Sequence, residues 1–129
     1  MIAVDTNVVV RFLVADDPVQ NARARRLFTS TEIFVPVTVI LETEWVLRGA
    51  YGLASGEIRA LLRGVLGLPR VICEESDKVA RALIWHERGL DFADALHLAS
   101  IGDAQALATF DAKLRRRARG LGGPEVVAP

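Results

Sequence analysis

Short apolar runs, most of them rich in β-branched residues, alternate with longer stretches in which apolar residues recur at helical spacing. Runs of three or four residues that are mostly apolar, flanked by turn-forming residues, predict strands. Five such runs are present: Ile2–Val4, Ile33–Val35, Val71–Cys73, Ala106–Thr109 and Glu125–Val127, the last of which is expected to be an edge strand. The polar residues Asp5, Thr6 and Asn7 end the first strand.

The helical pattern is clearest over Ile58–Leu66, where apolar residues fall at i, i+3, i+4, i+7 and i+8 and Gly67 and Pro69 follow. Another helix is expected to start at Pro18, with Asp17 as its N-cap. This helix is predicted to run to about Phe28. Four more helices are predicted: one from its cap Thr38 to about Tyr51, one from Ser76 or Asp77 to Gly89, one from Asp91 or Asp94 to about Ile101, and one from Asp111 to about Arg119.

Strands that alternate with helices of this length predict an α/β fold, in which helices cover both faces of a parallel sheet. The chain has 129 residues and shows no internal repeat, low-complexity segment or linker. We therefore expect a single domain over residues 1–129.

The composition excludes several classes of protein. A chain that is 51% hydrophobic and 25% charged is not intrinsically disordered, and it holds no apolar run long enough for a membrane helix. The residues Met1–Asp5 lack the features of a secretory signal. The lone Cys73 excludes an internal disulfide and suits a reducing compartment, so a cytoplasmic protein without membrane contact is expected.

Four acidic residues are expected at one edge of the sheet: Asp5, Glu42, Asp94 and Asp111. They follow strands or lie in the first turn or two of helices that begin at that edge, where α/β proteins bind their ligands. Carboxylates held close together repel unless they bind a cation or take up protons. Oxygen ligands without clustered Cys or His favour Mg²⁺ or Mn²⁺, and Mg²⁺ usually also contacts substrate phosphates. The alternatives are that Asp94 and Asp111 serve only as N-caps and that Glu42 lies on a solvated helix face.

Together these residues resemble a known family. The segments Ile2–Asn7, Asp91–Leu96 and Leu107–Asp111, with Glu42 between them, resemble the PIN-domain ribonucleases, and among them the VapC-type toxins of bacterial toxin–antitoxin pairs. The resemblance extends over essentially the whole chain and includes Arg11–Leu13 and Asp16–Pro18. It implies a three-layer α/β/α fold with a central, mainly parallel sheet of four to five strands.

The resemblance also implies a role for individual residues. Asp5 and Asp94 would be the principal metal ligands, and Glu42 and Asp111 would complete the acidic pocket. Thr6, Asn7 and Thr109 would orient carboxylates or water, and Asp91 would be a cap or an acid at the rim. The reaction would be hydrolysis of an RNA phosphodiester bond, in which Mg²⁺ or Mn²⁺ activates water and stabilises charge on the phosphoryl oxygens.

RNA needs cationic partners, although the chain as a whole has 16 acidic and 16 basic residues. Arg23, Arg25 and Arg26 are expected to lie on an ordinary helix surface. The one dense basic run would either hold the RNA backbone or form a solvated helix face; its members are Lys113, Arg115, Arg116, Arg117 and Arg119.

The toxin resemblance implies a homodimer and a separately encoded antitoxin. Apolar residues give weaker, independent support, because Trp45, Val46, Leu47, Tyr51 and the helix Ile58–Leu66 offer more apolar surface than one small sheet needs. The alternative is that these side chains all belong to the core of the monomer. Trp45 and Trp85 are expected in the core or at an interface.

Two other functions are compatible with an acidic α/β domain of this size. A receiver-like signalling domain also binds Mg²⁺ at strand ends, but it needs an acidic pair after the first strand and a Lys after the last. Here Asp5 is followed by Thr6 and Asn7, and neither Lys lies at the required place. A catalytically silent PIN scaffold would not require all four acids.

Overall fold

The computed structural model describes the whole chain, residues 1–129, as two compact units. The N-terminal unit is Met1–Ser76 and the C-terminal unit is Asp77–Pro129. All five strands predicted from the sequence are present and every strand pairing is parallel, which confirms the α/β class. None of the seven helices has the length and apolar character needed to span a membrane.

The N-terminal unit is built on a three-stranded parallel sheet in the order β1-β2-β3. Its elements are β1 (Ile2–Ala3), α1 (Thr6–Leu13), α2 (Pro18–Ser30), β2 (Ile33–Val35), α3 (Val37–Gly49), α4 (Ser55–Leu66) and β3 (Val71–Cys73). In register, Ile2 lies opposite Ile33, and Ile33 lies opposite Val71. Because the strands are parallel, their carboxyl ends lie at the same edge of the sheet.

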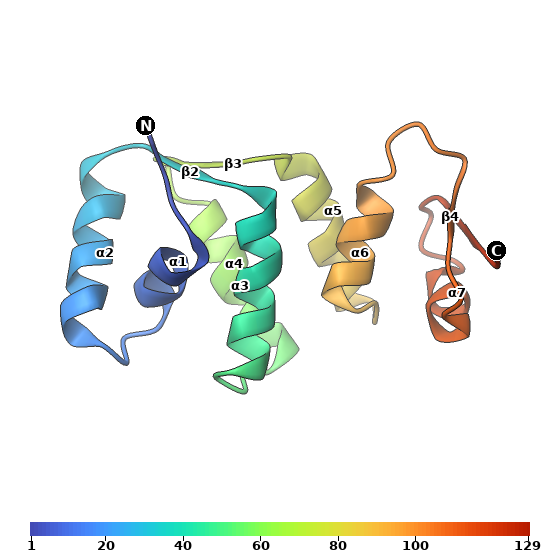
Figure 1. Cartoon of the computed structure of the whole chain (residues 1–129), viewed down its shortest axis with the longest axis horizontal. Helices are drawn as coiled ribbons and strands as arrows, with labels where there is room; N and C mark the ends of the chain where they lie inside the picture. Colours follow the sequence, from blue (N-terminus) through green and yellow to red (C-terminus); the bar gives the residue numbers. More distant parts are fainter. The chain divides into compact units, whose positions relative to one another are not determined.

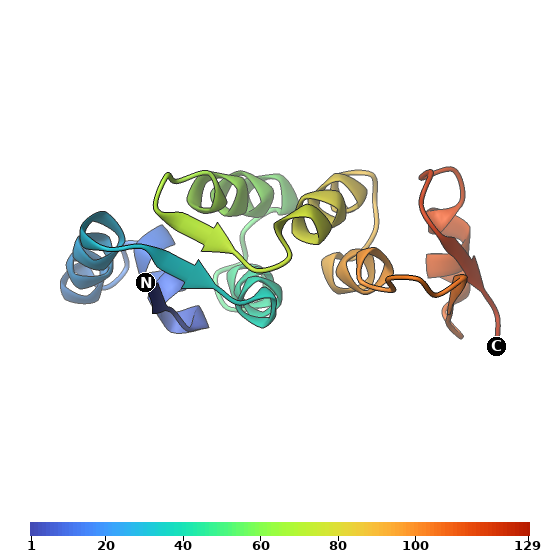
Figure 2. The ribbon, with the colours of Figure 1, turned by 90° about the horizontal axis from the view of Figure 1, so that it is seen from above.

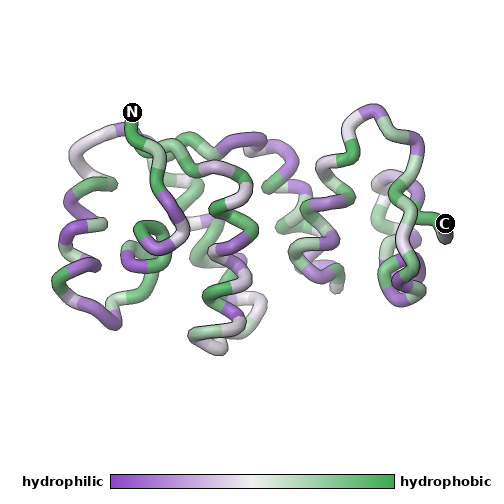
Figure 3. The backbone as a smooth tube through the Cα atoms, viewed as in Figure 1, coloured by the Kyte–Doolittle hydropathy of each residue, from purple (hydrophilic) through white to green (hydrophobic).

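Helix α1 packs against both α2 and α3 and lies between them (Figure 1). Seen from above, α4 lies on the β3 side of the strands and α1 on the β1 side (Figure 2). Helices in this unit show hydrophobic and hydrophilic residues in alternation along the backbone, as amphipathic helices do (Figure 3). The apolar faces form a core whose fully buried members include Val9, Ile33, Val35, Ile40, Leu47, Ile58 and Leu62.

The C-terminal unit holds a two-stranded parallel sheet and three helices. Its elements are α5 (Ser76–Glu87), which begins at the boundary between the units, α6 (Phe92–Ala99), β4 (Ala106–Ala108), α7 (Ala112–Ala118) and β5 (Glu125–Val127). Phe92 is buried and meets the ring of His86 edge to face. Trp85 is also buried, as expected, and the backbone at Gly123 lies directly against its ring.

Helix α1 is an element that the sequence pattern did not predict. It begins directly after Asp5 and contains Val8, Val9 and Val10 in succession. A run of β-branched residues disfavours a helix because it restricts side-chain rotamers against the preceding turn. Burial of Val9 and Val10 between the neighbouring helices outweighs that cost.

The predicted start of α3 was wrong. Thr38 is not its cap: the N-cap position is Pro36, which makes no side-chain capping bond. The backbone N–H of Val37 instead donates to the carboxylate of Glu74 at 2.9 Å. Glu74 is the residue that follows β3. The helix also ends at Gly49, before the predicted Tyr51.

The burial of several apolar residues also differs from expectation. Ile2 and Ala3 in β1 are exposed, because this strand of two residues is at the edge of the three-stranded sheet. In contrast, Ile58, Leu62 and Val65 of α4 are buried. The apolar face of α4 therefore belongs to the core, and of the residues proposed for a partner surface Trp45 is the prominent exposed one, at 62%.

Candidate active site

The first candidate acid lies where β1 turns into α1. Asp5 is the N-cap of α1, and its Oδ1 accepts a hydrogen bond from the backbone N–H of Val8 at 3.1 Å. This bond holds the carboxylate at the carboxyl edge of the sheet. The side chain is exposed and its Oδ2 is left without a protein partner. Asp5 therefore caps the helix with one oxygen and offers the other to a ligand.

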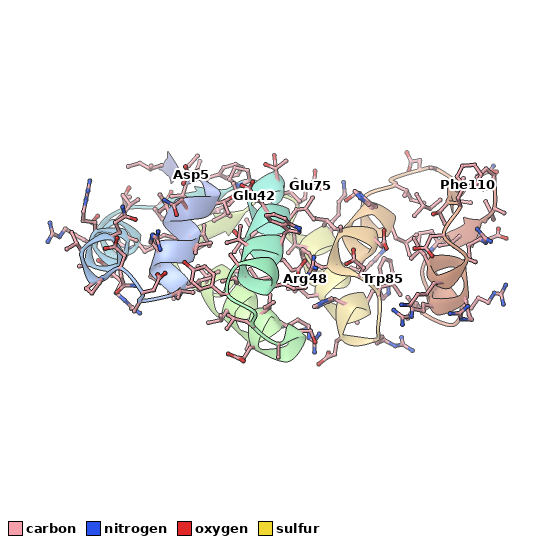
Figure 4. All side chains as sticks on the ribbon, turned by 60° about the horizontal axis from the view of Figure 1, so that its bottom comes forward. Asp5, Glu42, Arg48, Glu75, Trp85 and Phe110 are labelled. Carbon is pink, nitrogen blue, oxygen red and sulfur yellow. The ribbon has the colours of Figure 1, made fainter.

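The second acid reaches the same place from α3. The hydroxyl of Thr6 donates to Oε1 of Glu42, which lies 36 residues further along the chain. Figure 4 shows Asp5 and Glu42 beside one another where α1 and α3 begin. Both acids line a pocket of about 300 Å³ whose other members are Thr6, Asn7, Val10 and Val46. The structure thus brings together four residues predicted from the sequence.

Helix α3 carries a second glutamate, Glu44, to which the sequence analysis gave no role. Its side chain is only 2% exposed, and Arg48 on the next turn donates to its Oε2 at 2.9 Å. The neighbouring Thr43 is also buried, and its Oγ1 has no hydrogen-bond partner. Burial and the ion pair with Arg48 keep Glu44 out of the pocket, so Glu42 is the glutamate available to a ligand.

The C-terminal unit holds a second group of acids, around the start of α6. Asp91 is the N-cap of this helix, with its Oδ2 accepting from the backbone N–H of Asp94 at 3.3 Å. Asp94 is half-buried in the first turn and is not a cap. Burial raises the pKa of the Asp94 carboxyl, and the negative charges of Asp91 and Asp111 raise it further, while His97 opposes the shift.

Asp111 is the N-cap of α7, which the sequence analysis gave as the alternative to a role as a metal ligand. Its Oδ1 accepts from the backbone N–H groups of Lys113 and Leu114, at 2.9 and 3.1 Å. Its own N–H donates to the hydroxyl of Thr109 at 3.1 Å. Arg115 fixes the same loop by donating to the carbonyl oxygen of Thr109 at 2.7 Å. Because Asp111 caps with Oδ1 alone, Oδ2 remains for another ligand.

Two arginines of the basic run donate side-chain hydrogen bonds to backbone carbonyl oxygens. Besides Arg115, Arg117 donates to the carbonyl oxygen of Gly89 at 3.1 Å. The side chains of the other three, Lys113, Arg116 and Arg119, are exposed and make no hydrogen bond or ion pair with the protein. An aromatic side chain that the sequence analysis left without a role lies at the start of this segment: Phe110, between Thr109 and Asp111, is 88% exposed (Figure 4).

The chemistry of the pocket around Asp5 fits a hard divalent cation. Asp5 and Glu42 each have one carboxylate oxygen free of hydrogen bonds, and Mg²⁺ typically takes one or two carboxylates and keeps several waters. Within each unit taken by itself, no three His, Cys, Asp or Glu side chains are grouped so that they could hold a metal ion. Burial is the main cause that raises the pKa of Asp94, and the nearby charges of Asp91 and Asp111 add a repulsion that a cation near α6 would offset.

Comparison with known proteins adds independent information. The family model of the PIN domain matches residues 2–120, and so includes parts of both units. Among solved structures, the crystal structure of Mycobacterium tuberculosis VapC20, described as a Sarcin-Ricin loop cleaving toxin, is similar at 24% sequence identity with a TM-score of 0.45. The alignment covers 96% of this chain and 100% of that one. Among curated proteins, none matches the chain significantly.

Proposed function

Because the chain belongs to the PIN-domain family, we propose that it is a metal-dependent endoribonuclease and the toxin of a toxin–antitoxin pair. The observation that carries the proposal is the pocket in which Asp5 and Glu42 each present a free carboxylate oxygen. Family membership also removes the receiver-like signalling domain as an alternative.

The metal ligands we propose are Asp5, Glu42, Asp94 and Asp111, of which Asp5 and Asp94 are the principal ones. When bound, Mg²⁺ or Mn²⁺ would activate water and neutralise charge that develops on the phosphoryl oxygens. The chain's own residues prepare this chemistry by fixing the direction of each carboxylate. The hydroxyl of Thr6 holds Glu42 through one oxygen, and the N–H of Val8 holds Asp5 in the same way.

Loops around the acids act as positioning elements in this proposal. Thr109 and Arg115 fix the segment that presents Asp111. Asp91 fixes the first turn of α6, which carries Asp94. The free cations Lys113, Arg116 and Arg119 would bind RNA phosphates, for which basic side chains are the ordinary partners. Arg115 and Arg117 would contribute charge while keeping their backbone contacts.

The toxin assignment implies two protein partners. A homodimer is proposed because of the resemblance, and the exposed indole of Trp45 on α3 supplies apolar surface for it. An antitoxin is proposed to silence the enzyme. The protein would act in the cytoplasm, where free Cys73 stays reduced; burial raises the pKa of this thiol to about 11, so it has little thiolate character.

Cleavage of RNA by the purified protein tests the proposal. A panel of end-labelled RNAs should be cut with Mg²⁺ or Mn²⁺, and excess chelator should stop the reaction. Addition of the co-expressed product of the neighbouring reading frame should suppress cleavage. If no RNA is cut under any of these metal conditions, the protein is a catalytically silent scaffold and the proposal is wrong.

A further inference from the structure

A second groove lies on the other side of α1 from the acidic pocket. It is formed where α1 packs against α2 and has a volume of about 390 Å³. Part of its lining is apolar, from Val8, Ala24 and Leu27, and the rest is polar, from Asn7, Arg11, Gln20 and Arg23. No acidic side chain lines it.

The groove contains one cation that is free to bind an anion. Arg11 already has an acidic partner, because its guanidinium forms an ion pair with Asp16 at 2.9 Å and also donates to Gln20 and the hydroxyl of Tyr51. In contrast, Arg23 is exposed and makes no hydrogen bond, ion pair or ring contact. Helix α2 has no Asp or Glu between Pro18 and Ser30 that could neutralise it. The sequence pattern had placed Arg23 on ordinary helix surface, whereas the structure places it in the wall of a groove.

The polar groups beside Arg23 are hydrogen-bond donors as well. Gln20 uses its Oε1 to accept from Arg11 at 2.7 Å, so its amide NH₂ is the group left for a ligand. Asn7 makes no side-chain bond of its own and lines both the groove and the acidic pocket. The two cavities therefore share a wall at the first turn of α1.

We propose that this groove binds the RNA backbone next to the phosphodiester bond that is cut, with Arg23 as the ion-pair partner of a flanking phosphate. The inference rests on the proposed endoribonuclease function and extends it. The carboxylates of the pocket repel the phosphates on either side of the reacting one, so a strand that enters needs a cation nearby. A guanidinium suits this role because two of its N–H groups can donate parallel hydrogen bonds to two oxygens of one phosphate.

Binding of RNA in the absence of cleavage isolates this contact. The probe is a fluorescein-labelled single-stranded RNA of mixed sequence, and its anisotropy is followed over a salt series in EDTA. The variant is Arg23→Gln in the full chain. The matched control is Arg70→Gln, which loses the same charge from an exposed position just before β3, at the amino edge of the sheet. Mg²⁺-dependent cleavage by the wild type is measured in parallel.

Arg23→Gln is expected to weaken binding about two- to fivefold. It should also reduce the slope of log affinity against log salt by about 0.7, the value for one phosphate contact on a single strand. Arg23→Lys keeps the charge and should restore the slope. Arg70→Gln should bind RNA as the wild type does.

Three results would overturn the inference in different ways. If the wild type cleaves RNA and the Gln variants of Arg23 and Arg70 bind it equally, the groove has no part in RNA binding while the proposed function stands. If Arg23→Gln loses only the binding of a labelled polyglutamate peptide and retains RNA, the groove holds an acidic protein segment. If the wild type neither cleaves nor binds RNA, the proposed function fails and this inference fails with it.

Discussion

The hydroxyl of Thr6 donates a hydrogen bond to the carboxylate of Glu42, which connects the first turn of α1 to α3. Thr6 is buried whereas Glu42 is exposed, so the bond fixes a solvent-facing acid from a rigid position. Because Asp5 caps the same helix, this one bond sets where the two carboxylates of the pocket lie relative to each other.

Replacement of Thr6 by Val tests that relationship. Valine has nearly the same shape but cannot donate, so Glu42 loses its fixed direction while the core stays filled. We expect kcat for RNA cleavage to fall about tenfold, which corresponds to about 1.4 kcal/mol, with little change in KM. Thr6→Ser keeps the hydroxyl and should retain activity. Wild-type kcat in Thr6→Val would show that the bond does not position Glu42.

The two acids at the start of α6 should respond differently to substitution. Asp91 caps the helix, so Asp91→Ala should lower the free energy of unfolding by about 0.5–2 kcal/mol. Asp94 makes no capping bond, and Asp94→Asn should abolish cleavage without loss of stability. Chemical denaturation and a cleavage assay on the same samples separate the two effects. The assignment is reversed if Asp91→Ala abolishes cleavage and Asp94→Asn spares it.

Local sequence signals predicted those elements whose stabilising contacts are also local. The start of α2 was predicted correctly, because Asp17 accepts from the N–H of Gln20 and Pro18 takes the first helical position. Helix α1 was not predicted, since its valines favour a strand and only packing between α2 and α3 decides otherwise. The start of α3 depends on Glu74, a residue distant in sequence that no local pattern could identify.

In the candidate site, too, some features could be predicted from the sequence and others depend on packing between distant segments. The positions of Asp5 and Glu42 in the predicted elements identified these two acids, and the family resemblance added Thr6 and Asn7. The structure places all four around one pocket. The burial of Glu44 and the groove beside Arg23 depend on how helices pack, and so they become visible only in the structure. The roles assigned to Asp94 and Asp111 remain predictions.

The hydrogen-bonded cluster of Arg11, Asp16 and Tyr51 predicts a pH-dependent contribution to stability. The hydroxyl of Tyr51 donates to Asp16 at 2.9 Å, and this bond, assisted by Arg11, lowers the pKa of the Asp16 carboxyl. A carboxyl with a lowered pKa in the folded state stabilises the protein above its unfolded pKa. That contribution is lost as the pH falls through the folded pKa.

Tyr51→Phe should therefore reduce the Tm at about pH 7, and the difference from the wild type should narrow as the pH falls through the lowered pKa of the folded Asp16 carboxyl. Thermal melts of both proteins across this range measure it. A difference that stays constant with pH would show that the Tyr51 hydroxyl acts independently of the charge on Asp16.

The contact between Gly123 and Trp85 predicts opposite effects for two Gly→Ala substitutions. A Cβ at Gly123 would lie 2.5 Å from the buried Trp85 ring, so Gly123→Ala should cost about 1–3 kcal/mol through overpacking. Gly64 is inside α4 and a Cβ there meets no atom within 4 Å. Gly64→Ala should stabilise by about 0.5–1 kcal/mol. Equal Tm changes in the two variants would contradict this packing.

The most direct test of the account is the rate at which Asp5→Asn cleaves the labelled RNA panel in Mg²⁺ and Mn²⁺. Asparagine retains the N-cap of α1 but removes the charged metal ligand. The matched control, Asp17→Asn, makes the same change at the N-cap of α2, outside the pocket. The account predicts that Asp5→Asn folds with the Tm of the wild type and has lost cleavage, while Asp17→Asn cleaves normally. Full activity in Asp5→Asn would contradict the assignment of the metal site.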